Sequence, residues 1–311
     1  MIKRIIDGHA HIKPASLLND ENKRCGIVVK KFGRVESLEG ELLFRTMPEY
    51  MESSCFSAEA LLQVLDQNCV EKVMLMQSLC MKRNEETAQA VLKAPDRIHG
   101  AMLIEPKDES CLEEIEYWNQ RGLTALKFEM NPRLGYPYIY PDLHFDSPLF
   151  HKIWDKAEEK NLTVVIDPNR VGTPGYQPEA IKNAAQSHAG VRFVICHMGF
   201  ASLDYLGDPE KMAEWRKMRD LAVIDNVWLD LAAMPDLFQK EGHPYPTALT
   251  FLKETKEICG SKKLIWGTDI PGTYKSATYK QMIRMYEESD VFSEQEKEDF
   301  FYNNANDVYF V

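Results

Sequence analysis

The sequence predicts a (β/α)8 barrel, the TIM-barrel architecture of the α/β class. Eight short apolar runs, rich in β-branched residues and bounded by Gly, Pro or Asn, are typical of strands. Amphipathic helical patterns separate these runs, and 311 residues with 44% apolar content suffice for one large core. A doubly wound sheet is the alternative, but no glycine-rich turn follows the first strand, as that fold would require.

The predicted strands are short and strongly apolar, as strands buried on both faces of a parallel sheet should be. The first, "KRIIDGHAH", covers residues 3–11. The other seven are predicted at residues 70–77, 97–106, 123–130, 162–168, 191–199, 227–234 and 262–271.

Helices are predicted between the strands from apolar spacing and from cap residues. The segments with the clearest helical patterns are 57–68, 108–122, 147–161, 208–222 and 293–305. Ser57 is a predicted N-cap, and the third and fourth segments begin with a cap residue followed by proline. Ser293 and Glu296 have the spacing of a capping box.

Residues 12–56 interrupt this alternation. The whole chain, 1–311, is predicted to be one barrel domain, and this segment is predicted to be an insertion after the first strand. It contains short apolar pieces but no clear helix. Connections of this length are often lids or binding loops; a small decorative hairpin or a dimer contact is an equal alternative.

Composition narrows the classes of partner. The net charge of −11 and the pI of about 5.3 disfavour nucleic acids and anionic membranes, which attract basic surfaces. Seven cysteines in irregular spacing, without C-x-x-C, predict reduced thiols in a cytoplasmic protein. Neither a signal peptide nor a transmembrane helix is predicted. We expect a small-molecule substrate.

Ionisable residues gather at the predicted strand ends. In a barrel, the carboxyl ends of the strands form one face, where function concentrates. The first strand ends in His9 and His11, two residues apart and therefore on one side, with Ala10 facing outward. The fourth, fifth, sixth and eighth strands add Lys127, Glu129, Asp167, His197 and Asp269. Imidazoles and carboxylates that converge in this way predict a metal site.

Three motifs resemble a known family. "DGHAH" after the first strand, "FVICHMG" on the sixth and "LIWGTDIPG" on the eighth are similar to motifs of the amidohydrolase superfamily. More narrowly, they resemble the amidohydrolase-2 group of metal-dependent hydrolases and decarboxylases, such as aminocarboxymuconate semialdehyde decarboxylase. The closing "NNANDVYF" resembles the group's C-terminal segment. The resemblance supports the barrel and implies a possible homodimer.

The resemblance also implies roles for particular residues. His9 and His11 match metal ligands, and Asp269 matches an aspartate that binds the metal and handles a proton. His197 matches a histidine that polarises the substrate or shuttles a proton. Asp167 stands where the group usually has a histidine ligand. It is therefore either a carboxylate ligand of the metal or a residue that contacts a ligand without binding the metal. A third alternative is that the protein has lost the metal. We expect one divalent ion: zinc first, with manganese or magnesium as alternatives.

Four further residues are interpreted individually. Lys127 matches a position that is carbamylated in binuclear relatives, but we expect a substrate contact or an ion pair with Glu129. Arg170 is a candidate anchor for a substrate carboxylate, with a surface salt bridge as the alternative. Tyr136 lies in a tyrosine-rich segment that either walls a pocket or forms a rigid loop. Cys196 precedes His197 and is therefore predicted to face the helices and pack there.

Three functions are compatible with these observations. The first is a metal-dependent hydrolase of a lactone, amide or ester, in which Asp269 accepts a proton from water and His197 stabilises developing charge. The alternative is a non-oxidative decarboxylase of an aromatic or unsaturated carboxylate that uses the same site. A barrel retained only for binding is disfavoured, because it would not need ionisable groups at so many strand ends.

Overall fold

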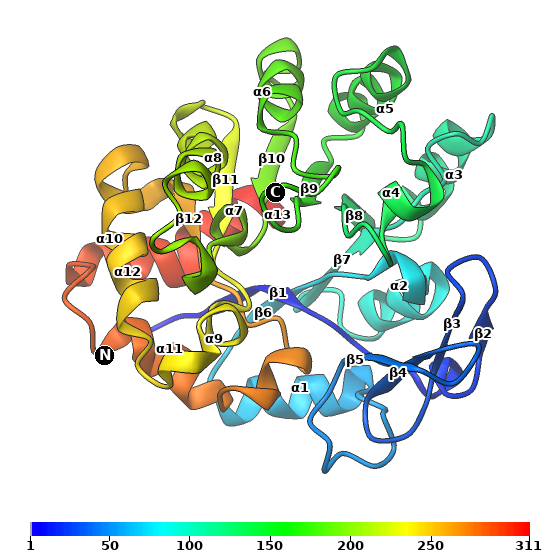
Figure 1. Ribbon diagram of the computed structural model, residues 1–311, viewed down its shortest axis with the longest axis horizontal. Helices are drawn as coiled ribbons and strands as arrows, with labels where there is room; N and C mark the ends of the chain where they lie inside the picture. The colour runs from blue at the N-terminus through cyan, green and yellow to red at the C-terminus, as the bar shows by residue number, and fades with distance from the viewer. Residues whose placement is uncertain (1) are drawn as a thin grey trace.

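A parallel eight-stranded barrel forms the centre of the molecule, which we describe from a computed structural model covering residues 2–311. The strands are hydrogen-bonded in chain order, and helices surround them (Figure 1). They are β1 (Ile6–Ala10), β6 (Lys72–Leu75), β7 (Ile98–Met102), β8 (Leu123–Glu129), β9 (Thr163–Asp167), β10 (Arg192–Ile195), β11 (Val227–Asp230) and β12 (Leu264–Ile265). All eight predicted strands are confirmed, as is the barrel.

The barrel closes between its last and first strands. Gly8 N donates to Trp266 O at 3.0 Å, and Thr268 N donates to His9 O at 3.2 Å. The buried Asp7 carboxylate strengthens this seam by accepting hydrogen bonds from the Thr268 and Tyr279 hydroxyls. Burial raises the pKa of Asp7 to about 6. The seam therefore fixes "DGHAH" against "GTDIP" directly below the open end of the barrel.

One main helix follows each strand. In order they are α1 (Ala58–Gln67), α2 (Asn84–Lys93), α3 (Cys111–Asn119), α5 (Pro148–Glu159), α6 (Pro178–Ser187), α8 (Pro209–Arg219), α10 (Pro246–Cys259) and α11 (Tyr279–Glu287). Ser57 caps α1 by accepting from Ala60 N, as predicted. The predicted helix at 293–305 is α12 (Glu294–Glu298), a π-helical turn (Asp299–Asn303) and α13 (Asn304–Tyr309), and its capping box is present.

Two apolar cores determine which end of the barrel is open. The larger core lies between the strands and the helices and includes an aromatic group around Phe128 and Trp154. The second core fills the barrel interior and continues into Val308 and Tyr309 of α13. Since α13 covers the amino ends of the strands, the opposite end is the one that opens to solvent.

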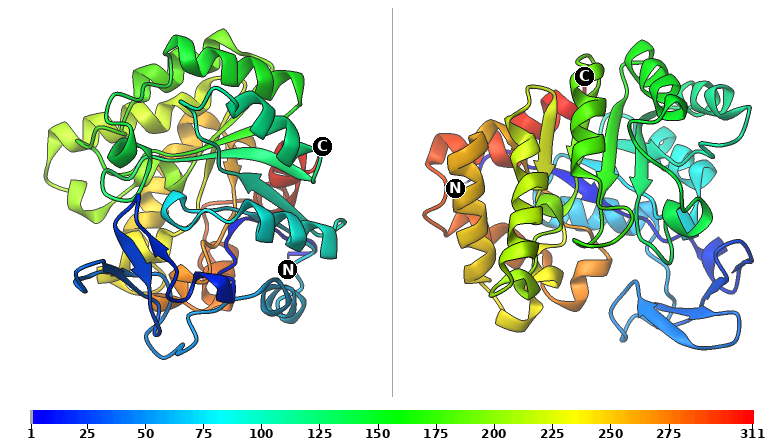
Figure 2. Two further views of the ribbon diagram at one scale, coloured as in Figure 1. Left: turned by 90° about the vertical axis from the view of Figure 1, so that its right-hand side faces the viewer. Right: turned by 45° about the horizontal axis from the view of Figure 1, so that its top comes forward.

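The insertion at 12–56 folds as a small antiparallel sheet. Its strands are β2 (Glu21–Asn22), β3 (Ile27–Val29), β4 (Arg34–Ser37) and β5 (Leu42–Arg45), and they lie beside the barrel in both views of Figure 2. Ile27 and Val35 pack with Cys80 and Met81 of the barrel loops. This packing positions the end of β5 at the barrel mouth.

Among residues 2–311, no helix combines the length and apolar character needed to cross a bilayer.

Candidate active site

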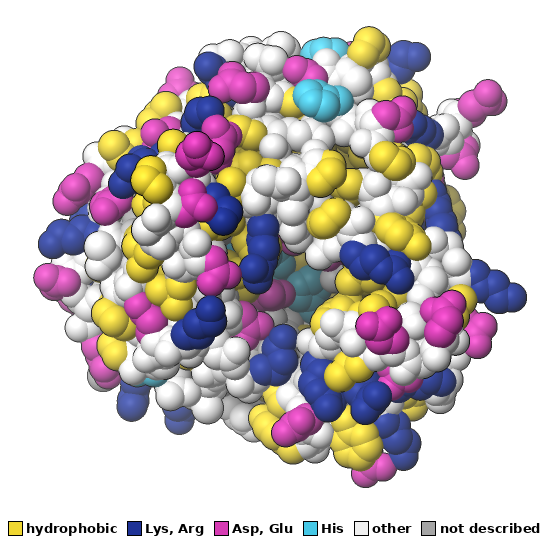
Figure 3. All heavy atoms as spheres, viewed as in Figure 1, with side chains coloured by type: hydrophobic (Ala, Val, Ile, Leu, Met, Phe, Trp, Pro, Cys, Tyr) yellow, Lys and Arg dark blue, Asp and Glu magenta, His cyan; other side chains and the backbone are white. Residues whose placement is uncertain are grey.

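A cavity of about 600 Å³ opens at the carboxyl ends of the strands. Figure 3 shows it as a hollow with acidic and histidine side chains at its floor and Lys and Arg side chains around its rim. Residues from the insertion, the barrel loops and the strand ends line it. Its position is the one expected for the active site of a barrel enzyme.

His9 and His11 both point towards the open end of the barrel because the backbone of β1 is irregular. The pairing register of β1 with β6 shifts between Asp7 and Ala10. Ile6 therefore faces the barrel interior while Ala10 packs among the helices, and the two imidazoles face the mouth with ring centroids 5.2 Å apart. The predicted orientation of His9, Ala10 and His11 is confirmed.

Asp269 brings a carboxylate to these two histidines. Its Oδ1 lies 2.8 Å from His11 Nε2 and 3.8 Å from His9 Nε2, and the three ligand atoms lie within 4.8 Å of one another. Two ligands on one zinc ion, at about 2.0–2.2 Å from it, are roughly 3.4 Å apart. The donor atoms of His9, His11 and Asp269 therefore fit a single divalent ion.

Asp230 orients the first histidine from behind. Its Oδ2 accepts a hydrogen bond from His9 Nδ1 at 2.9 Å, which leaves His9 Nε2 free to face Asp269. Its Oδ1 accepts from the backbone N–H groups of His197 at 2.8 Å and Ala232 at 3.2 Å. A carboxylate behind a metal-binding histidine is the arrangement that fixes its tautomer in known zinc sites.

The protonation states of this cluster suit metal binding. Burial lowers the pKa of His9, and it lowers the pKa of His11 to about 4, so both imidazoles are neutral at pH 7. Burial alone would raise the pKa of Asp269, but the hydrogen bond from His11 and the nearby histidines hold it below its usual range. The cluster therefore offers two neutral nitrogens and one carboxylate.

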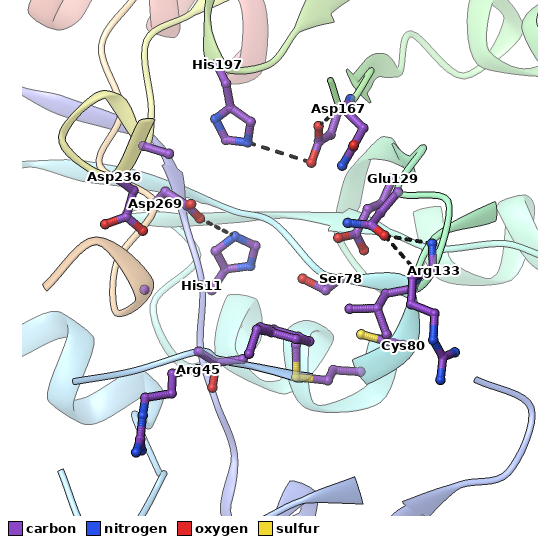
Figure 4. A pocket seen from close by; sticks show the side chains of 18 of the residues that line it. His11, Arg45, Ser78, Cys80, Glu129, Arg133, Asp167, His197, Asp236 and Asp269 are labelled. Atoms are coloured by element: carbon purple, nitrogen blue, oxygen red, sulfur yellow. Dashed lines mark hydrogen bonds and ion pairs between the residues drawn. The ribbon is translucent and has the colours of Figure 1, made fainter. Parts of the chain in front are cut away.

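His197 and Asp167 lie on the other side of the cavity floor (Figure 4). His197 Nε2 is 3.8 Å from Asp167 Oδ2, and His197 Nδ1 is 3.0 Å from the Ala232 carbonyl. Burial would lower the pKa of His197, but the carboxylates of Asp167, Asp230 and Asp269 raise it. Asp167 is not part of the His9, His11 and Asp269 group, so its role as a ligand stays a prediction.

The prediction that Cys196 faces the helices is wrong. Cys196 packs in the barrel interior, where its Sγ accepts a hydrogen bond from Lys127 Nζ at 3.0 Å. The two-residue alternation fails because β10 ends at Ile195 and the backbone of His197 is left-handed, with φ of 59°. Cys196 and His197 can therefore both point inward.

Lys127 and Tyr136 lie apart from the cavity. Lys127 is buried below the floor, and its contact is Cys196 rather than the predicted Glu129. Tyr136 is fully buried on Phe128, with its hydroxyl donating to the Ile104 carbonyl at 2.7 Å. Neither side chain lines the cavity, so the structure does not support the predicted substrate contacts.

Glu129 and Arg170 do line the cavity. Burial and the nearby Asp167 carboxylate raise the pKa of Glu129 to about 7, and its Oε2 accepts from Leu79 N at 2.8 Å. Arg170 is mostly exposed and lies 3.4 Å from Asp204, which is the surface salt bridge that was its alternative interpretation. Arg170 also remains within reach of the cavity.

Sequence reasoning missed most of the positive charge in the cavity. Five cationic side chains line it: Lys13, Arg45, Arg133, Arg170 and Lys275. Four carboxylates accompany them: Glu129, Asp167, Asp236 and Asp269. A divalent ion would add two further positive charges to this lining, although the chain as a whole carries −11. Lys13 lies two residues beyond His11, so strand alternation could have predicted that its side chain faces the cavity. The positions of the other four cations follow no such pattern.

The family model for amidohydrolases known as Amidohydro_2 matches residues 6–311. The chain belongs to the Amidohydro_2 family. This match confirms the resemblance drawn from "DGHAH", "FVICHMG" and "GTDIP". Among curated protein sequences, no relative matches the chain.

Solved amidohydrolase structures share the fold at low identity. One, described as a probable 2-pyrone-4,6-dicarboxylic acid hydrolase from Acinetobacter baumannii with citric acid bound, is 17% identical, with a TM-score of 0.68 over 99% of this chain and 100% of that one. An amidohydrolase from Burkholderia multivorans with bound zinc is 14% identical, with a TM-score of 0.70 over 99% and 100%. The 5-carboxyvanillate decarboxylase from Sphingomonas paucimobilis is 18% identical, with a TM-score of 0.60 over 99% of both chains.

Proposed function

We propose that this protein is a metal-dependent hydrolase that acts on a lactone, amide or ester of a small carboxylic acid. The observation that carries the proposal is the cluster of His9, His11 and Asp269, of which His11 and Asp269 line an open cavity. The hydrogen bond from His9 to Asp230 supports it, because it presents the nitrogen that a metal would need. We expect one divalent ion, with zinc ahead of manganese or magnesium.

The side chains have distinct roles in this proposal. A divalent ion held by His9, His11 and Asp269 would lower the pKa of water and polarise a carbonyl group. Asp269 is charged and accepts the proton of the attacking water. His197 Nδ1 is held by Ala232 O, and the carboxylates of Asp167, Asp230 and Asp269 raise the pKa of the metal-free ring. When protonated, the ring would donate a hydrogen bond to developing negative charge.

The five cationic side chains of the cavity support an anionic substrate. They also favour the second candidate, a non-oxidative decarboxylase, since that reaction requires a carboxylate to be held at the same site. In both reactions His197 and Asp269 are the residues in position to transfer protons. The two candidates differ in whether CO2 leaves.

The proposal is tested by metal removal and by product analysis. Treatment with a chelator should abolish turnover, and added Zn²⁺ should restore it. A panel of lactones, esters and hydroxylated aromatic acids is then assayed in parallel for acid release and for CO2. Acid release without CO2 supports hydrolysis, and CO2 release selects decarboxylation. A protein that binds no divalent ion, or whose turnover survives complete metal removal, would refute both.

A further inference from the structure

Lys13 is a buried lysine that, in the part of the chain that the structure describes, has no carboxylate within ion-pair distance. Burial lowers its pKa, and the more distant carboxylates of Asp269 and Glu129 oppose that shift. Its side chain lines the cavity near the candidate metal ligands, and it is only 7% exposed. The contact of its Nζ is Met81 Sδ at 3.8 Å, and within residues 2–311 no carboxylate oxygen lies within 4.0 Å of it. A buried charge is costly unless it is paired, so such a group points to a missing anion.

The other cationic side chains of the cavity differ from Lys13. Arg170 pairs with Asp204, Lys275 pairs with Asp236, and Arg45 lies 3.6 Å from Glu49. Arg133 donates to the Cys25 carbonyl and is less buried. Among the five, within the described part of the chain, only Lys13 is both buried and without a polar acceptor.

The backbone holds Lys13 in a fixed place. Lys13 N donates to Phe56 O, and Phe56 N donates to Lys13 O, both at 2.8 Å. These two bonds join the ends of the insertion where the chain leaves β1 and returns towards α1. The Lys13 ammonium is thus attached to the same rigid segment as His11. An anion bound to this ammonium would therefore lie at a fixed distance from the candidate metal ligands.

We propose that Lys13 forms a carboxylate subsite beside the candidate metal centre. Its ammonium binds a substrate carboxylate that is separate from the reacting carbonyl, and the substrates are therefore small acids that carry at least one such carboxylate. The inference rests on the proposed function for the place of the reacting group. Among anions, a carboxylate suits one compact ammonium, whereas phosphate sites usually gather several donors.

Binding measurements on the metal-loaded protein test the subsite. The probes are succinate, glutarate, adipate and isophthalate, each compared by calorimetry with its own monoamide, which lacks one charge. Wild-type protein should prefer at least one diacid over its monoamide. Lys13→Met should remove that preference, with a loss of about 10- to 100-fold for the diacid and little change for the monoamide.

Lys256→Met is the matched control, since Lys256 is partly buried, pairs with Glu296 and does not line the cavity. It should leave the preference unchanged. Lys13→Met should also raise the melting temperature of the ligand-free protein, because an apolar chain of similar length replaces an unpaired charge. Metal content is measured in each variant.

Three results would overturn the subsite. The first is a wild-type protein that does not prefer any diacid over its monoamide, and the second is a preference that survives Lys13→Met. The third is a Lys13→Met protein with a lower melting temperature that binds none of the probes, which would mean that Lys13 supports the fold. These results are separate from failure of the proposed function. A protein that hydrolyses nothing can still show the preference, and an active hydrolase can lack it.

Discussion

Asp230→Asn is the sharpest test of the metal site, because it changes one buried atom behind His9. The carboxylate accepts three hydrogen bonds, from His9 Nδ1 on one oxygen and from the backbone of His197 and Ala232 on the other. Asparagine has one acceptor oxygen and one donor group. If its oxygen remains with the two backbone groups, its NH2 faces His9 Nδ1 and forces the ring proton onto Nε2, where it blocks metal binding.

The opposite orientation of the amide is also costly. Its NH2 would then face two backbone N–H groups, and these buried donors would lack partners, which costs about 1–3 kcal/mol of stability. Loss of an outer partner of a metal-binding histidine typically weakens metal affinity by about 10- to 100-fold, or roughly 1.4–2.7 kcal/mol. We therefore expect Asp230→Asn to weaken zinc binding within this range, to lower the melting temperature, or to do both.

Competition with a chromogenic zinc chelator measures the affinity, and thermal unfolding measures the stability. Asp236→Asn is the matched control, because Asp236 lines the same cavity but contacts Lys275 and Ser276 rather than a histidine. It should leave zinc affinity unchanged. Equal zinc affinity and equal melting temperature in wild type and Asp230→Asn would refute the role of Asp230 in orienting His9.

Two further predictions concern residues whose roles the sequence left open. Asp167→Ala should weaken metal binding in the same chelator assay. Asp167→His should weaken it less, because histidine is the ligand type usual in the family. Unchanged metal affinity in the alanine variant would show that Asp167 is not a ligand. Tyr136→Phe should leave KM unchanged and cost about 1 kcal/mol of stability, since it removes one buried hydrogen bond to Ile104. A large rise in KM would instead return Tyr136 to the substrate site.

The strands and the meeting of His9, His11 and Asp269 could be predicted because both depend on local regularities. Eight apolar runs predicted the barrel, and barrel geometry then placed the ends of distant strands on one face. His9, His11 and Asp269 were among the residues expected there, and the family resemblance marked them, with Asp167, as candidate ligands. The irregularity in β1 lies between Asp7 and Ala10, and His9 and His11 still face the same side, so it did not disturb this result.

The cationic lining could not be predicted in the same way. Arg45 comes from the inserted sheet, and Arg133 and Lys275 come from loops after β8 and β12. Their meeting depends on how the insertion packs on Cys80 and Met81, which no periodicity encodes. Tyr136 shows the opposite case, since its polar, aromatic segment resembled a pocket wall but buries its ring and satisfies its hydroxyl internally.

Regular alternation fails at the strand ends for a reason connected with the site itself. Asn169, His197, Ala233 and Asp269 follow four neighbouring strands, and all have φ near 60°, a conformation that costs non-glycine residues about 1–3 kcal/mol. A regular strand would turn every second side chain towards the helices. The left-handed turn at His197 instead lets the imidazole join Asp167 at the mouth while Cys196 remains in the interior. The backbone N–H of His197 bonds to Asp230, so the carboxylate that orients His9 also stabilises this strained turn. Strand periodicity is therefore least informative for the side chains that follow the last regular residue of each strand.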